Sequence, residues 1–173
     1  FMATLDDARA LARSIVDVAN AAGCRTSALL TNMNWVLGAS AGNAVEVLES
    51  VQAMANPAEA DERLISVCVA LVGEMLVNSG LVDSPVTARE QARASLDSGA
   101  ALERFGKMVA GLGGPADFGE NPEKHLAAAA VVRPVMAAEA GFASAHATRD
   151  LGVAIIGLGG GRTQPGAPID HAV

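Results

Sequence analysis

Apolar residues recur at helical spacing along the first part of the chain. Thr4 is followed three residues later by Asp7, which resembles a capping box with an aspartate in place of the usual glutamate. Gly23 suits the residue that ends a helix in a left-handed conformation. The pattern predicts a helix between these ends, with this apolar face: Ala8, Leu11, Ala12, Ile15, Val18, Ala19 and Ala22.

The same spacing predicts further helices along the chain. A second runs over about 42–54 and stops before Asn56–Pro57, and a third covers about 64–76. Ser84 followed by Pro85 opens a fourth, to about residue 96, because proline suits the first helical position. A fifth covers about 101–112, a loop with one helical turn covers 116–128, and a short helix follows Thr148 or Asp150 up to residue 158.

Other apolar stretches lack helical spacing and predict strands. Residues 26–31 show no polar alternation, as expected of a strand buried on both faces. Residues 131–136 and 141–145 suggest a hairpin, and the final residues 168–173 resemble another strand. The expected fold class is therefore α/β, with helices packed on a small, mainly parallel or mixed sheet and a short β element near the C-terminus.

The whole chain, 1–173, fits one domain, with a helix-rich core over about 1–128 and a hairpin, short helix and terminal strand over about 129–173. Its net charge of −7 and few aromatic residues argue against nucleic-acid or anionic-membrane partners. No apolar run reaches the ~18 residues needed to span a bilayer.

Cys24 and Cys68 are expected to be reduced core thiols of a cytoplasmic protein. The Phe1–Met2 start and the abrupt end suggest a piece of a longer chain.

The stretch LTNMNWVLGASAGNAVEV, residues 30–47, joins a predicted strand to a predicted helix through small residues. Glu46 and Glu49 lie three positions apart on that helix and can point the same way. Together with carbonyl groups of the preceding turn, they would form an oxygen cage for a hard cation. The alternative is an ordinary solvated helix face.

No other motif completes a catalytic or binding set. The run GLGGGR, residues 157–162, matches no phosphate-loop pattern and follows a helix, so we expect a helix end and a turn, with Arg162 outside any anion clamp. His125, His146 and His171 show no metal-ligand spacing. Ser144, His146 and Asp150 lack the turn that presents a catalytic serine.

Three blocks resemble the thymidine phosphorylase and pyrimidine-nucleoside phosphorylase family in the same order: LLTNMNWVLGASAGNAVEV, ALERFGKMVAGLGGPADFGENPEKHL and GFASAHATRDLGVAIIGLGGGR with PIDHAV. The resemblance implies part of the catalytic α/β domain of a homodimeric pentosyltransferase. Such enzymes use phosphate to cleave a pyrimidine nucleoside such as thymidine, giving thymine and 2-deoxyribose 1-phosphate, without an organic cofactor. The phosphate loop and the Arg, Ser and Lys that bind the base would precede Phe1. No catalytic residue is therefore expected here, and this piece alone should be inactive.

The resemblance also assigns roles to single residues. Phe1 corresponds to an apolar residue that borders the base pocket. Leu37 and Ser40, through their backbone carbonyls, and Glu49, through its carboxylate, correspond to ligands of a potassium ion. Asn32 and Trp35 depart from the aspartate and the polar residue usual in the thymidine branch, which affects the local turn and the substrate preference.

Two other interpretations remain open at this stage. One is a related phosphoribosyltransferase, although the Gly-Thr-Gly-Gly-Asp signature of the anthranilate enzymes is absent from the sequence. The other is a non-catalytic α/β interaction module derived from such an enzyme.

Overall fold

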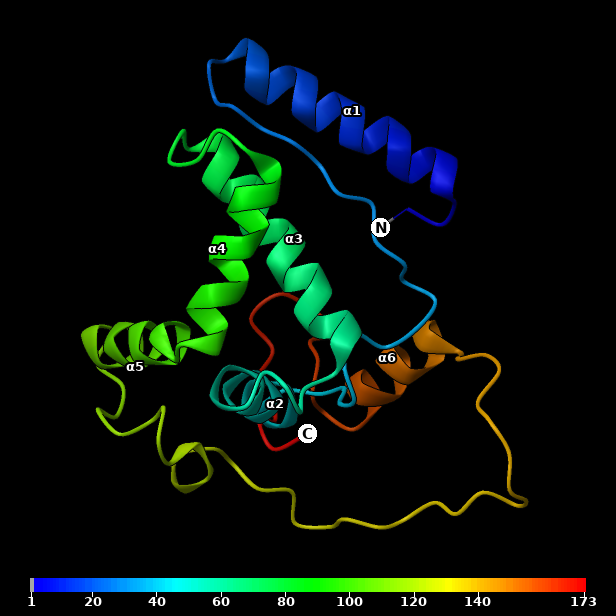
Figure 1. The fold of residues 1–173 in the computed structure, drawn as a ribbon. Coiled ribbons are helices and arrows are strands. Elements are labelled where there is room, and N and C mark those ends of the chain that lie inside the picture. The colour runs from blue at the N-terminus through cyan, green and yellow to red at the C-terminus, as the bar shows by residue number, and fades with distance from the viewer. Residues whose placement is uncertain (1) are drawn as a thin grey trace. The chain divides into compact units, whose positions relative to one another are not determined.

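All secondary-structure elements in residues 2–173, the part described by the computed structural model, are helices (Figure 1). The helices are α1 (Leu5–Ala21), α2 (Ala44–Ala55), α3 (Glu62–Asn78), α4 (Pro85–Asp97), α5 (Ala100–Gly111), the short 3-10 helix η1 (Pro122–Lys124) and α6 (Thr148–Gly157). Each helix predicted from the apolar spacing is confirmed, with ends shifted by no more than three residues. Among residues 2–173, no helix is both long enough and apolar enough to cross a membrane.

Local capping explains where the first helix begins and ends. The hydroxyl oxygen of Thr4 accepts a hydrogen bond from the backbone N–H of Asp7 at 3.2 Å, and the same hydroxyl donates to the Asp7 carboxylate at 2.7 Å. Gly23 follows the helix with φ of 81°, a conformation that glycine adopts without steric cost. The cap and the terminal glycine predicted from the sequence are both present.

The prediction of an α/β fold is wrong for residues 2–173, because no β-strand forms in that range. A strand must exchange backbone hydrogen bonds with a second strand, and residues 26–31 find a different partner. The side-chain amide of Asn20 accepts from the N–H of Thr26 at 3.1 Å and donates to its carbonyl at 3.0 Å. Leu30 is 48% exposed, so this stretch is also not buried on both faces.

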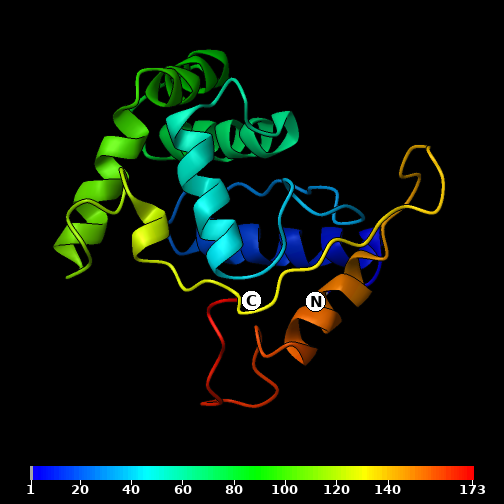
Figure 2. The same cartoon turned by 90° about the horizontal axis from the view of Figure 1, so that it is seen from below.

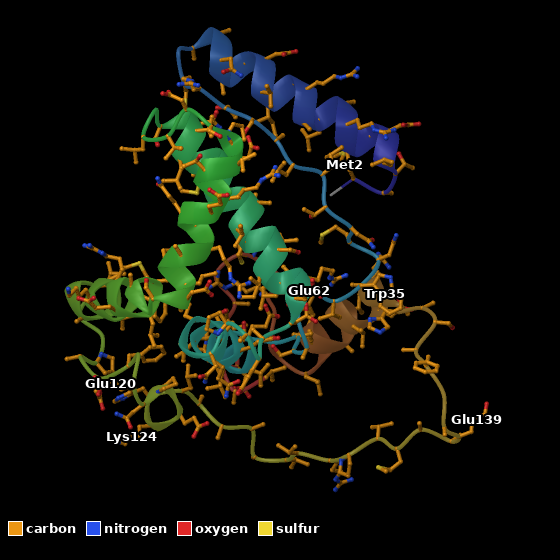
Figure 3. All side chains as sticks on the ribbon, viewed as in Figure 1. Met2, Trp35, Glu62, Glu120, Lys124 and Glu139 are labelled. Atoms are coloured by element: carbon orange, nitrogen blue, oxygen red, sulfur yellow. The ribbon has the colours of Figure 1, made fainter. Side chains whose placement is uncertain are left out.

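The predicted C-terminal β elements are also wrong. Residues 127–147 form a long connection without helix or strand, drawn as a yellow to orange coil in Figures 1 and 2 and including Glu139, which Figure 3 labels. Val135 and Phe142 are 97% and 101% exposed. Pro134, in the middle of the first expected strand, has no N–H to donate to a ladder. In the final stretch, the carbonyls of His171 and Val173 accept hydrogen bonds from the start of α2 instead of from a strand.

The structure divides into two compact units, which are described separately. The first comprises the chain up to Asn32 together with Ile65–Ser95. Among its described residues, the buried apolar side chains are Ile65, Ala88 and Ala92, and Ala88 is fully buried. Gly73 of α3 lies so close to α4 that a Cβ there would be 2.9 Å from the Arg89 side chain. Ser27 donates to Glu74 at 2.7 Å and accepts from Asn78 at 2.9 Å, which fixes the stretch after α1 to one face of α3.

The second unit comprises Met33–Leu64 and Leu96–Val173, and α2 is its centre. Val51 is 3% exposed, and burying a side chain of this size contributes about 1.5–3 kcal/mol to the stability of the unit. Helix α2 contacts both α5 and η1. The expectation of one partial catalytic domain remains a prediction.

The loop around η1 is organised by Asp117. His125 lies 2.7 Å from the Asp117 carboxylate through Nε2, and this hydrogen bond is the main reason that the pKa of Asp117 lies below its usual range. The amide of Asn121 donates to the same carboxylate at 3.4 Å, and Phe118 stacks on the His125 ring with centroids 6.1 Å apart. Asp117 therefore closes this loop, which contacts the side of α2.

Both cysteines are free, as expected, but the prediction that they lie in the core is wrong. Cys24 and Cys68 are exposed. Cys24 directly follows the glycine that ends α1, and its carbonyl accepts from the hydroxyl of Thr26 at 3.0 Å. Apolar spacing placed Cys68 on the inner face of its helix, but α3 buries only Ile65 and Gly73.

Candidate functional site

The loop before α2 is held by a carboxylate from within that helix. Both oxygens of Glu49 accept backbone hydrogen bonds, from the N–H of Ala39 at 2.7 Å and from the N–H of Ser40 at 3.0 Å. The Ser40 hydroxyl donates to the same carboxylate. Hydrogen bonds to an ionised carboxylate are roughly twice as strong as neutral ones, so this triple contact fixes the path of the loop.

Small residues make this close approach feasible. Gly38 has φ of 78°, and a Cβ at this position would lie 2.5 Å from an oxygen of Glu49. Only glycine can adopt this positive φ without strain and also leave room for the Glu49 carboxylate. The run from Gly38 to Gly42 therefore reflects the fit of a backbone turn around a carboxylate, and we name residues 34–40 the Glu49 loop.

The outer end of the Glu49 loop is held by side chains from other elements of the same unit. Arg63, in the first turn of α3, donates to the carbonyl of Val36. Thr148, the first residue of α6, donates through its hydroxyl to the carbonyl of Asn34 at 2.8 Å. The rings of Trp35 and His146 contact each other with centroids 4.2 Å apart and planes tilted by 53°. Figure 3 labels Trp35 beside α6.

The start of α2 is closed by the last residues of the chain. The backbone N–H of Ala44 donates to the carbonyl of His171 at 3.1 Å, and that of Asn43 donates to the carbonyl of Val173. The Asn43 side chain donates to the carbonyl of Gly160 at 2.8 Å. These carbonyls satisfy N–H groups that a helix leaves unpaired at its N-terminus, so this end of α2 does not offer an open anion site.

A cavity of about 520 Å³ lies beside the Glu49 contact. Its polar lining consists of three carboxylates, two amides and a hydroxyl: Glu49, Glu59, Asp61, Gln52, Asn56 and Ser40. Hard oxygen atoms with net negative charge suit a cation and disfavour phosphate. Within residues 2–173, however, no three His, Cys, Asp or Glu side chains gather closely enough to hold a metal ion by themselves.

The structure brings together two of the residues predicted to bind potassium, Ser40 and Glu49, while the side chain of Leu37 in the same loop is 45% exposed. The peptide groups that donate to Glu49 are those preceding Ala39 and Ser40. The potassium hypothesis uses the carbonyls of Leu37 and Ser40, which belong to the two flanking peptide groups. These carbonyls are separate from the N–H groups that bond to Glu49, but the Glu49 carboxylate oxygens would serve in both roles. The potassium site remains a prediction.

The remaining predicted residues have simpler roles. Glu46 accepts from the backbone N–H of Gly42 at 2.8 Å and so supports the start of α2. The run 157–162 ends α6 as expected, with Gly159 at φ of 98° and Arg162 donating to the carbonyl of Ala167 at 3.1 Å. Phe1 lies outside the described residues.

Three contributors to the site were missed from the sequence: Arg63, His146 and Thr148. Arg63 and Thr148 act on backbone carbonyls, which are present at every position and leave no sequence signal. The one available clue was Trp35, the only tryptophan, which stands where a polar residue is usual and whose large ring favours an aromatic partner.

We predict that Gly38→Ala destabilises the protein more than an alanine at another glycine with positive φ. At Gly38, left-handed strain of about 1–2 kcal/mol adds to displacement of the Glu49 carboxylate, for a total of about 3 kcal/mol. Gly166→Ala is the matched control, because Gly166 has φ of 81° with nothing within 4 Å of its Cβ position. Urea unfolding followed by circular dichroism measures both. Equal losses in the two variants would contradict the close fit of Glu49.

Comparison with known families places these residues in context. A family model described as the a/b domain of a glycosyl transferase family matches residues 1–102, more than half of the 173-residue chain. The matched stretch contains the Glu49 loop, all of α2 and Arg63. The contacts from His146 and Thr148 come from beyond it. The chain belongs to this glycosyl transferase family.

Proposed function

We propose that this chain is part of a pyrimidine nucleoside phosphorylase, a pentosyltransferase that uses phosphate to release a base such as thymine from its deoxyribose. Membership of a glycosyl transferase family supports transfer of a glycosyl group. The finer assignment is supported by the resemblance of the three sequence blocks, above all the block that builds the Glu49 loop. That loop, closed on a carboxylate inside the family domain, is the observation that carries the proposal.

The proposed reaction needs one bond to form and one to break. A phosphate oxygen bonds to the anomeric carbon of the sugar, and the bond from that carbon to the base nitrogen breaks. The electron pair leaves with the base, which a nearby hydrogen-bond donor stabilises. In this proposal, the groups that hold phosphate and base come from outside the chain, and Phe1 packs against the base. The contribution of the described residues is a rigid, negatively charged wall formed by the Glu49 loop and its cavity.

The test is product analysis with the longer protein that contains this chain. Incubation with thymidine and phosphate should give thymine and 2-deoxyribose 1-phosphate, detected by chromatography, whereas the isolated 173-residue chain should release none. Uridine in a parallel reaction reports the effect of Asn32 and Trp35 on substrate preference. Phosphate-dependent base release by the isolated chain would contradict the proposal that the groups that hold phosphate and base come from outside it. Pyrophosphate release from a phosphoribosyl donor would instead identify a phosphoribosyltransferase.

We also propose a potassium ion at Leu37, Ser40 and Glu49, supported by the negative cavity beside them. A ligand that binds only the folded state stabilises it by mass action, so 100 mM KCl should add about 1.4 kcal/mol for a dissociation constant on the order of 10 mM. Choline chloride at the same ionic strength is the reference. Glu49→Gln should abolish the difference, and the matched variant Glu46→Gln should retain it. Identical stability of the unaltered chain in both salts would refute the site.

A further inference from the structure

Residues at the start of α6 hold the Glu49 loop although more than a hundred positions separate them in sequence. Thr148 donates to the carbonyl of Asn34, and His146 contacts the ring of Trp35. All four residues belong to the same compact unit. The two contacts act on neighbouring residues of the loop, one through the backbone and one through a side chain, so together they restrict both its position and its rotation.

The hydroxyl of Thr148 is directed to the loop and not to its own helix. Helix α6 begins after Ala147, whose methyl group cannot accept a hydrogen bond, and no side-chain hydrogen bond caps this helix start. A threonine one position earlier would supply the usual cap. The start of α6 therefore lacks a side-chain cap, and the hydroxyl of Thr148 donates to the Glu49 loop instead.

The segment before α6 does not explain these contacts. Residues 127–147 are exposed throughout, and the large apolar residues among them are 67–101% exposed. This connection therefore supplies no packed surface that would carry His146 to Trp35. Closing a chain segment of this length also costs entropy, which the contacts themselves must offset.

We propose that His146 and Thr148 are positioning residues, which form a clasp with Trp35 and Asn34 that keeps the Glu49 loop closed on its carboxylate. The clasp joins a segment outside the matched family domain to the loop inside it. Its importance for substrate rests on the proposed function, but the clasp itself is measurable without any activity. Opening the clasp frees residues 34–36. The nearby hydrogen bonds to Glu49 then open more often, and the amide hydrogens of Ala39 and Ser40 exchange faster with water.

The sequence makes this measurement unusually selective, because Trp35 is the only tryptophan and there is no tyrosine. Acrylamide quenching of intrinsic fluorescence in the 173-residue chain therefore reports on Trp35 alone. We expect His146→Ala to raise the quenching constant of Trp35 about twofold through increased local opening. His146→Phe, which keeps a ring, should restore the low value. His125→Ala is the control, since His125 contacts Asp117 and Phe118 instead.

A second pair of variants tests the backbone contact. Thr148→Val removes the hydrogen bond and keeps the shape, and loss of one such bond should accelerate amide hydrogen exchange at Ala39 and Ser40 about fivefold. Thr148→Ser should leave that rate unchanged. Unchanged quenching in His146→Ala together with unchanged exchange in Thr148→Val would refute the clasp. Equal effects in His125→Ala would also refute it, because they would show general loosening. Failure of phosphorolysis by the longer protein would leave both results standing and would affect only the proposed function.

Discussion

The carboxylate of Glu49, bonded to the backbone of Ala39 and Ser40, fixes the loop on which the account of this protein depends. Two charge-assisted hydrogen bonds and a hydroxyl define where the chain runs between residues 34 and 43. Gly38 is required because the carboxylate occupies the space that any side chain would need. Everything proposed for the region, from the negative wall beside a substrate to the potassium ligands, assumes that this one contact forms.

The loop is also a point where distant parts of the chain meet. The N-terminal end of α2 is closed by carbonyls of residues 160–173, and the other end of the loop is held from α3 and α6. The Glu49 loop lies within residues 1–102, which the family model matches, and is held in part by residues beyond the match. Few side chains in the molecule are fully buried, so these polar contacts carry a larger share of the local order than they would in a tightly packed core.

Features that depend on neighbouring residues could be predicted from the sequence, and features that depend on distant residues could not. The helices were predictable because their spacing, caps and terminal glycines are local, as Thr4 and Gly23 illustrate. The strands were not, because an apolar stretch becomes a strand only when a partner strand is available, and Thr26 instead pairs with the side chain of Asn20. In the candidate site, the helical spacing paired Glu46 with Glu49 and the family resemblance singled out Glu49. Neither gave information on the N–H groups that donate to the Glu49 carboxylate. The roles of Arg63 and Thr148 depend on folding across long sequence separations and could not be read from any short motif.

The most direct test of the account is a scalar coupling across the hydrogen bonds themselves. In isotope-labelled protein, the amide nitrogens of Ala39 and Ser40 should each couple measurably to the side-chain carboxyl carbon of Glu49, because electron density is shared across hydrogen bonds of 2.7 and 3.0 Å. Both couplings should be present in the unaltered chain and absent from Glu49→Ala. Absence of both couplings in a folded sample, with amides of Ala39 and Ser40 that exchange as fast as solvent-exposed ones, would contradict it.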